Sequence, residues 1–235
     1  MLKQLWYKLP FTGEPDPIVA RVALEGVIAP EARTRRALNL ASVEKALMKA
    51  FSVPDIKAVV LTINSPGGSP TQSRMIHDRA RALSEKEKVP IITYIEDVGA
   101  SGGYMLALAG DEIFADPFAV VGSIGVITAG FGFPEAIEKL GVERRVYTAG
   151  KNKSQLDPFK AEGQGDVTRI QEVLGEIHVL FVQMVKDRRG GRITGEDDDL
   201  FNGAYWIAGD AVDHGLIDRT GDLRALLQER FGEEV

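Results

Sequence analysis

The sequence predicts an α/β protein in which a parallel sheet is covered by helices. Short apolar runs alternate with longer segments whose apolar residues recur at helical spacing. Residues 56–63 (IKAVVLTI) and 89–95 (VPIITYI) have the composition of strands buried on both faces, as in a parallel sheet. No Pro/Gly/Ser-rich linker and no repeat divides the chain, so we expect one domain (1–235) with an N-terminal arm (1–17) and a core (18–225).

The elements follow one another in strand–helix order. The expected strands are residues 18–26, 56–63, 89–95, 112–115 and 145–148. The expected helices are residues 41–51, 71–88, 101–109 and 166–188, the last with a long apolar stripe. The longest uncharged run, residues 117–134, contains several glycines, so we interpret it as strand, loop and strand and not as a membrane span. The acidic run 196–199 is expected to be a solvated loop, since no histidine stands near it.

The composition is that of an ordinary globular protein. The 235 residues are 44% hydrophobic and 26% charged, enough for a substantial core. The net charge of −6 argues against nucleic acid as a partner, and the absence of cysteine excludes disulfides, a thiolate nucleophile and cysteine metal sites. No signal peptide is visible. The apolar N-terminal arm is expected to pack on the core or on a neighbouring subunit, with membrane-surface association as the alternative.

Ser101 is the candidate nucleophile. It follows a predicted strand in the stretch GASGGY (99–104) and opens a helix of small residues. The structural alternative is that its hydroxyl only caps the helix. The neighbouring Gly102 and Gly103 favour the functional interpretation, because they allow another backbone to come close and a cap does not need that. The positive end of the helix dipole would also stabilise a developing oxyanion.

A serine hydroxyl needs a base to take its proton. The three histidines, His77, His178 and His214, lie in predicted helices or at a helix end and not in glycine-marked loops. The remaining candidates are Lys151 and Lys153, which follow a predicted strand and a glycine. A lysine acts as a base only in its neutral form, so burial must lower its pKa from the ordinary value of about 10.4.

Two further loops supply supporting groups. The stretch NSPGG (64–68) follows a buried strand, and its purely structural interpretation is a strand-to-helix turn. The functional interpretation is an oxyanion hole in which the N–H groups of Gly68 and Gly102 donate to the reacting carbonyl. Ser123 lies in an apolar run between Gly122 and Ile124, where a buried hydroxyl needs a partner such as a lysine amine.

These motifs together resemble the signal peptide peptidase A (SppA) family of bacterial and archaeal serine proteases, whose fold is shared with the Clp protease proteolytic subunit and with crotonases. The resemblance covers residues 19–223 and is strongest in 64–68, 100–104, 116–126, 150–153 and 211–221. It implies that Ser101 is the nucleophile and Lys153 the general base, with Lys151 as runner-up. It places Ser123 where the family has a serine that hydrogen-bonds the lysine, and Gly68 at the oxyanion position.

The resemblance also implies a ClpP/crotonase-like fold and a serine peptidase of the short, single-domain form. Peptides such as remnant signal peptides, or other substrates with small or apolar side chains, would be cleaved without metal or cofactor. The family implies a homo-oligomer in which a neighbouring subunit can complete the active site. Family members often have a membrane anchor and none is visible here, so we expect a cytoplasmic or peripherally membrane-associated protein of bacterial or archaeal origin.

Two other functions remain open from the sequence. A crotonase-type enzyme would bind an acyl-CoA thioester in the same oxyanion hole and use carboxylates such as Glu96 and Asp97. A ring-forming scaffold with an inactive site is the non-enzymatic alternative. The presence of every site residue argues against the scaffold.

Overall fold

The computed structural model describes residues 16–30 and 37–235. The predicted N-terminal arm therefore lies almost entirely outside the described residues. The chain forms two compact units. The described residues of the first, called the core unit, are 16–30, 37–124 and 182–235, and the second, called the insert unit, is Gly125–Phe181. The single-domain organisation of the whole chain stays a prediction.

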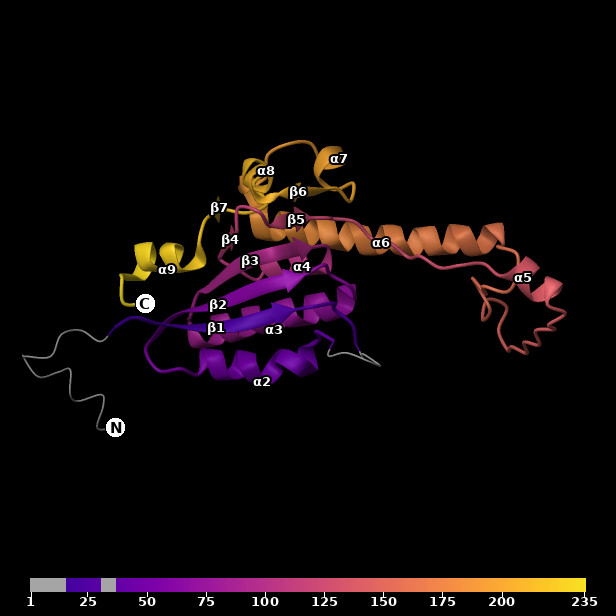
Figure 1. Cartoon of the computed structure of the whole chain (residues 1–235), viewed down its shortest axis with the longest axis horizontal. Coiled ribbons are helices and arrows are strands. Elements are labelled where there is room, and N and C mark those ends of the chain that lie inside the picture. The colour runs from indigo at the N-terminus through magenta and orange to yellow at the C-terminus, as the bar shows by residue number, and fades with distance from the viewer. Residues whose placement is uncertain (1–15, 31–36) are drawn as a thin grey trace, which may run out of the picture. The chain divides into compact units, whose positions relative to one another are not determined.

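Among the described residues, the core unit contains a seven-stranded sheet (Figure 1). Five parallel strands lie in the order β1 (Ile18–Glu25), β2 (Ile56–Ser65), β3 (Ile91–Ala100), β4 (Glu112–Ala115) and β7 (Arg219–Thr220). A sixth strand, β5 (Val120–Gly122), continues the sheet in parallel beside the end of β3. The last, β6 (Tyr205–Ile207), pairs with β5 and is antiparallel. The predicted α/β class with a parallel sheet is confirmed.

The end of β3 lies between the ends of two other strands. Gly99 on β3 is the register partner of Ser65 on β2, and Ala100 is the partner of Gly122 on β5. Parallel strands finish at the same edge of a sheet, and binding sites of α/β proteins form at that edge. The loops after β2, β3 and β5 therefore meet, although the sequence separates them.

Helices α2 (Leu40–Phe51), α3 (Pro70–Glu87) and α4 (Gly102–Ala107) pack on one another and on the sheet. Each of the first two begins at a capping residue. The Asn39 side chain accepts a hydrogen bond from the Ser42 N–H, and the Ser69 side chain accepts one from the Gln72 N–H. Such caps satisfy backbone donors that a helix start leaves unpaired. All three helices lie where the sequence predicted helices.

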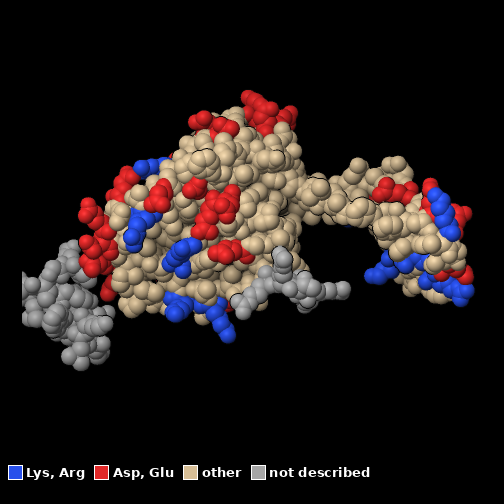
Figure 2. All heavy atoms as spheres, viewed as in Figure 1, with Lys and Arg blue, Asp and Glu red and all other residues tan. Residues whose placement is uncertain are grey.

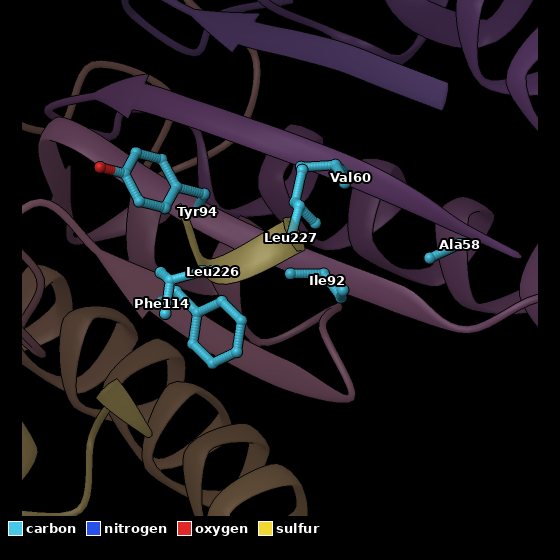
Figure 3. Packing of buried hydrophobic residues seen from close by; sticks show 7 residues of the cluster. All are labelled: Ala58, Val60, Ile92, Tyr94, Phe114, Leu226 and Leu227. Atoms are coloured by element: carbon cyan, nitrogen blue, oxygen red, sulfur yellow. The ribbon is translucent and has the colours of Figure 1, made fainter. Parts of the chain in front are cut away.

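Helix α9 (Leu223–Phe231) covers the opposite face of the sheet (Figure 3). Leu226 and Leu227 from this helix contact apolar side chains that alternate along the strands. The strand members of this cluster are Ala58, Val60, Ile92, Tyr94 and Phe114. The sequence analysis did not predict α9, which is short and has charged residues among its apolar ones.

Replacing Leu226 with alanine should destabilise the core unit by about 2–5 kcal/mol, because a buried leucine leaves a cavity when it is truncated. The Leu226 side chain belongs to the cluster in Figure 3 and the residue is 6% exposed. Urea unfolding followed by circular dichroism measures the change. Met48→Ala on α2 is the control, since Met48 is 50% exposed and its truncation should change the free energy of unfolding by well under half as much.

The remaining helical elements are α5 (Pro134–Lys139), α6 (Gln164–Arg189), η1 (Gly190–Arg192), α7 (Asp197–Leu200) and α8 (Ala208–Asp213). The predicted helix 166–188 is confirmed as α6, which begins in the insert unit and ends in the core unit. Its apolar stripe is fully buried only near its C-terminal end, at Phe181 and Val185, whereas Leu180 is 70% exposed. No helix in the described ranges is both long and apolar enough to cross a membrane.

Three local predictions differ from the structure. Residues 145–148 do not form a strand, and the run 117–134 contains only one strand, β5, followed by chain without regular secondary structure up to the start of α5. A strand needs a neighbour to pair with its backbone groups, and the described chain provides none for these two segments. The acidic run 196–199 is exposed as predicted, but most of it forms the short helix α7, which the buried Leu200 anchors.

Candidate active site

Ser101 lies between the end of β3 and the start of α4 in an unusual backbone conformation. Its φ of 52° and ψ of −123° are rare for a residue with a side chain and cost of the order of 1–3 kcal/mol. The Ser101 N–H donates to the Gly122 carbonyl (2.8 Å), and its own carbonyl accepts from the Tyr104 N–H (2.9 Å). Its hydroxyl makes no capping hydrogen bond. The helix-cap interpretation therefore does not account for Ser101.

Glycines surround Ser101 because there is no room for side chains. A Cβ atom on Gly67 would lie 2.7 Å from the Gly102 nitrogen and 2.9 Å from the Ser101 Cβ. A Cβ on Gly102 would lie 2.4 Å from the Ser73 Oγ, and one on Gly68 would lie 2.0 Å from the Ile28 carbonyl oxygen. These distances are shorter than van der Waals contact. The loop after β2 is therefore in direct backbone contact with the turn that carries Ser101.

Two backbone amides at this contact have no partner among the residues that the structure describes. Neither the Gly68 N–H nor the Gly102 N–H donates a hydrogen bond to any residue in the described part of the chain. The amides lie close together, because a Cβ on Gly102 would be 3.3 Å from the Gly68 nitrogen. Gly102 is buried, and native structures rarely leave a buried donor unpaired, whereas Gly68 is exposed and its amide is open to solvent or a ligand. The arrangement can therefore accept an oxygen atom of a bound molecule beside Ser101.

Ile28 and Ser65 hold the Gly67–Gly68 turn in place. The Ile28 N–H donates to the Gly67 carbonyl (2.9 Å), and the Ile28 carbonyl accepts from the Ser69 N–H (2.8 Å). From the other side, the Ser65 Oγ accepts from the Gly67 N–H (3.1 Å) and donates to the Gly26 carbonyl (2.7 Å). The sequence analysis did not identify these two supporting residues, because the Ile28 contact joins segments that are far apart in the chain.

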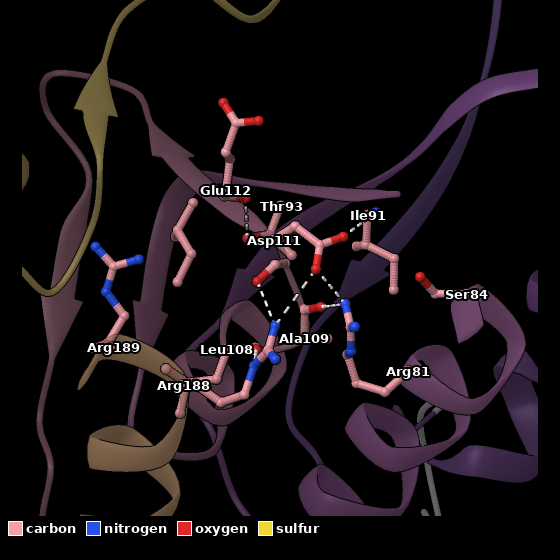
Figure 4. A network of polar contacts seen from close by, with 12 residues as sticks. Arg81, Ser84, Ile91, Thr93, Leu108, Ala109, Asp111, Glu112, Arg188 and Arg189 are labelled. Carbon is pink, nitrogen blue, oxygen red and sulfur yellow. Dashed lines mark hydrogen bonds and ion pairs between the residues drawn. The ribbon is translucent and has the colours of Figure 1, made fainter. Parts of the chain in front are cut away.

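Helix α4 is fixed at the end away from Ser101 by two arginines (Figure 4). Arg81 on α3 donates to the Ala109 carbonyl (3.2 Å), and Arg188 on α6 donates to the Leu108 carbonyl (2.8 Å). Positive groups at a helix C-terminus satisfy its free carbonyls and complement its dipole. Asp111 accepts from Arg81 (2.6 Å) and keeps the guanidinium in place.

The fully buried Tyr104 ties α4 to the C-terminal part of the chain. Its hydroxyl donates to the Leu216 carbonyl (2.6 Å), and burial raises the pKa of Tyr104. Nearby, Arg189 donates to both Asp218 carboxylate oxygens (2.8 and 3.0 Å). The Tyr104 hydrogen bond thus joins the 99–104 stretch to the 211–221 stretch, although the two are far apart in the sequence.

Ser123 follows β5, beside the nucleophile strand. Its φ of 53° again places a residue with a side chain in the left-handed region, and its N–H donates to the Ala204 carbonyl (2.7 Å). Because Ala100 and Gly122 are register partners, Ser101 and Ser123 directly follow paired positions on neighbouring strands. Ser123 is half-buried. The core unit thus brings together Ser101, Ser123, Gly68 and Gly102.

Lys153 lies in the insert unit, in a turn where its N–H donates to the Gly150 carbonyl (3.2 Å). Lys151 lies in the same turn, and both residues are exposed in the single chain. A lysine base must be kept from water, so any shielding of Lys153 has to come from residues outside its own turn. The pairing of Lys153 with Ser101 stays a prediction.

Other titratable groups near the sheet edge are engaged elsewhere. Glu96 pairs with Arg21 (2.8 Å), and Asp97 accepts a hydrogen bond from Asn64. His77 is buried on α3, where desolvation lowers its pKa despite the neighbouring Asp78 carboxylate (2.9 Å). Within residues 16–30 and 37–235, His214 lies against the Trp206 ring, with the two ring centroids 5.1 Å apart. In those same ranges, no group of acidic and histidine side chains has the arrangement of a metal site.

Comparison with known proteins places the chain in a family. The model of peptidase family S49 matches residues 84–231, which include Ser101, Ser123 and Lys153. A Brucella abortus protein named Na⁺/H⁺ antiporter NhaA is 51% identical over 201 residues, covering 86% of this chain and 27% of that protein. Protease 4 of Haemophilus influenzae is 31% identical over 222 residues, covering 94% of this chain and 35% of that protein. The chain thus spans only about a third or less of these two relatives.

Among solved structures, a mutant of the 1510-N membrane-bound stomatin-specific protease matches with a TM-score of 0.56. The match covers 92% of this chain and 85% of that one at 15% identity, so it bears on the fold alone. It confirms the predicted ClpP/crotonase-like fold. The resemblance to SppA-type serine peptidases is confirmed at the level of the family, and the chain belongs to peptidase family S49.

Proposed function

We propose that the chain is a serine peptidase in which Ser101 is the nucleophile and Lys153 the general base. One observation carries this proposal: Ser101 has a strained backbone and a hydroxyl that does not cap its helix, beside two amides that have no partner in the described part of the chain. Strain of this kind persists where function requires it. Membership of a peptidase family supports the same conclusion.

In the proposed reaction, the neutral Lys153 amine takes the Ser101 proton as Oγ attacks the carbonyl carbon of a peptide bond. The carbonyl oxygen becomes an oxyanion and accepts hydrogen bonds from the N–H groups of Gly68 and Gly102. The Lys153 ammonium group then gives its proton to the leaving amine, and water hydrolyses the acyl-enzyme with the same lysine as base. Ser123 would orient the lysine by accepting a hydrogen bond from it.

A fluorophosphonate probe should label Ser101 covalently, because such probes react with activated serine hydroxyls. Peptide mass mapping of the labelled wild-type protein identifies the modified residue. Ser101→Ala should show no labelling, whereas Ser123→Ala should still be labelled at Ser101. Labelling that persists in Ser101→Ala, or none in the wild type, would reject the proposed nucleophile and favour an inactive scaffold.

The substrates we propose are peptides with small or apolar side chains, including remnant signal peptides. The proposed assembly is a homo-oligomer in which a neighbouring subunit can shield Lys153, which is exposed in the single chain. Acidic and basic side chains are interspersed on the visible face of the core unit (Figure 2), which gives no extended basic surface there for nucleic acid. The proposed location is the cytoplasm or the surface of a membrane.

A further inference from the structure

The loop that carries Lys153 is closed at its base by an ion pair. Arg144 precedes this lysine loop (residues 145–156) and Asp157 follows it, and the Arg144 Nε atom lies 3.1 Å from the Asp157 Oδ2 atom. The Asp157 side chain is only 3% exposed, whereas Lys151 and Lys153 at the turn are exposed. A buried carboxylate at the base of an exposed basic loop calls for an explanation, since burying a charge is unfavourable unless it is paired.

Asp157 uses both carboxylate oxygens and its own carbonyl in this arrangement. Its Oδ1 atom accepts from the Phe159 N–H (3.1 Å), and its backbone oxygen accepts from the Lys160 N–H (3.1 Å). The Phe159 hydrogen bond, together with Arg144, holds the pKa of the Asp157 carboxyl below its ordinary value. The lowered pKa favours the charged form of Asp157, which is the form that pairs with Arg144.

Aromatic packing anchors this ion pair to the rest of the insert unit. The Arg144 guanidinium lies over the Phe159 ring, 4.8 Å from its centroid, and the Phe159 and Phe133 rings are 5.8 Å apart. The Phe133 N–H donates to the Pro158 carbonyl directly before α5 begins. The base of the loop is thus attached to α5 by a cation–π contact, a ring contact and a backbone hydrogen bond.

The far part of the lysine loop has few such attachments. The Gly150–Lys153 turn is closed by one backbone hydrogen bond. The Leu156 N–H donates to Asp166 in the first turn of α6 (3.2 Å). The neighbouring pair Arg145–Glu143 is 68% and 71% exposed and does not close the loop. The direction in which the loop presents Lys153 therefore depends chiefly on its base.

We propose that Asp157 and Arg144 are positioning residues that hold Lys153 in the orientation needed to activate Ser101. This inference rests on the proposed function of Lys153 as the base. Catalytic groups must be held to within about 0.5 Å by neighbours that are themselves fixed, and a displacement of about 1 Å can lower the rate about 10²-fold. The Arg144–Asp157 ion pair at the base of the lysine loop meets this requirement without contacting the substrate.

Asp157→Ala should lower kcat about 10²-fold and leave KM nearly unchanged, because the substrate would still bind to the core unit. Asp157→Asn keeps an oxygen for the Phe159 N–H and should lose less. Arg144→Gln also removes the ion pair. Because the Arg144 side chain is partly exposed, this substitution should affect folding less than one at Asp157. Glu143→Gln is the matched control: it removes the exposed pair in the same segment and should leave kcat unchanged.

A double-mutant cycle distinguishes positioning from general stability. The rate of Ser101 acylation by an activated ester is measured for Asp157→Ala, Lys153→Ala and the double variant. If Asp157 acts through Lys153, its replacement should have no further effect in the Lys153→Ala background. An equal loss in both backgrounds would overturn the proposal, as would full activity of Asp157→Ala beside an impaired Lys153→Ala. Wild-type activity of Lys153→Ala would show that Lys153 is not the general base, and the positioning role of Asp157 and Arg144 would be rejected with it.

Discussion

Lys153→Ala is expected to lower kcat/KM for peptide cleavage by about 10²–10⁴-fold, the usual contribution of a positioned general base. Without the amine, the Ser101 proton has no acceptor except water. The effect should fall on kcat, because the lysine acts mainly in the transition state. Steady-state hydrolysis of a fluorogenic peptide, compared at equal protein concentration, measures the change.

Lys151→Ala is the matched control for this prediction. Lys151 has the same charge, lies in the same exposed turn and is two residues away, so its removal should leave activity close to that of the wild type. The reverse result, with Lys151→Ala inactive and Lys153→Ala active, would make the runner-up the base. Equal activity of both variants and the wild type would exclude a lysine of this loop as the base.

The sequence predicted the parts of the molecule that depend on local patterns. The apolar runs of β2 and β3 and the helical spacing in α2 and α3 were enough to place these elements within a few residues. The glycine-marked loops were also recognisable, because close backbone approach requires glycine whatever the partner is. Parallel strand order then brings the loops after β2, β3 and β5 to one edge.

The contacts that support the site were not predictable in the same way. In the sequence, Ile28 is an ordinary apolar residue. Only the fold shows that its backbone hydrogen-bonds to Gly67 and Ser69 and so fixes the Gly67–Gly68 turn. Arg144 and Asp157 read as unrelated surface charges until the ion pair at the loop base is seen. The left-handed φ of Ser101 is likewise invisible, because serine has no preference for it and tertiary contacts impose it.

Gly67→Ala should abolish most of the activity, with a loss of at least about 10²–10³-fold, the effect of removing one oxyanion donor. The new methyl group would lie 2.7 Å from the Gly102 nitrogen and 2.9 Å from the Ser101 Cβ, so it would displace both the amide and the nucleophile. Gly67 also has a φ of 96°, so strain would reduce the free energy of unfolding by about 1–3 kcal/mol.

Gly232→Ala separates the two effects of that substitution. Gly232 has a similar φ of 103° at the end of α9, but nothing lies within 4 Å of the position of a Cβ atom there. The control should therefore lose only the roughly 1–3 kcal/mol that comes from backbone strain, without the steric clash at Gly67, and keep its activity. Measuring thermal unfolding and peptide hydrolysis for both variants tests the argument. If Gly67→Ala stays active while it is as destabilised as Gly232→Ala, the loop after β2 does not form the oxyanion site, since a methyl group against the Gly102 nitrogen would then be harmless to the reaction.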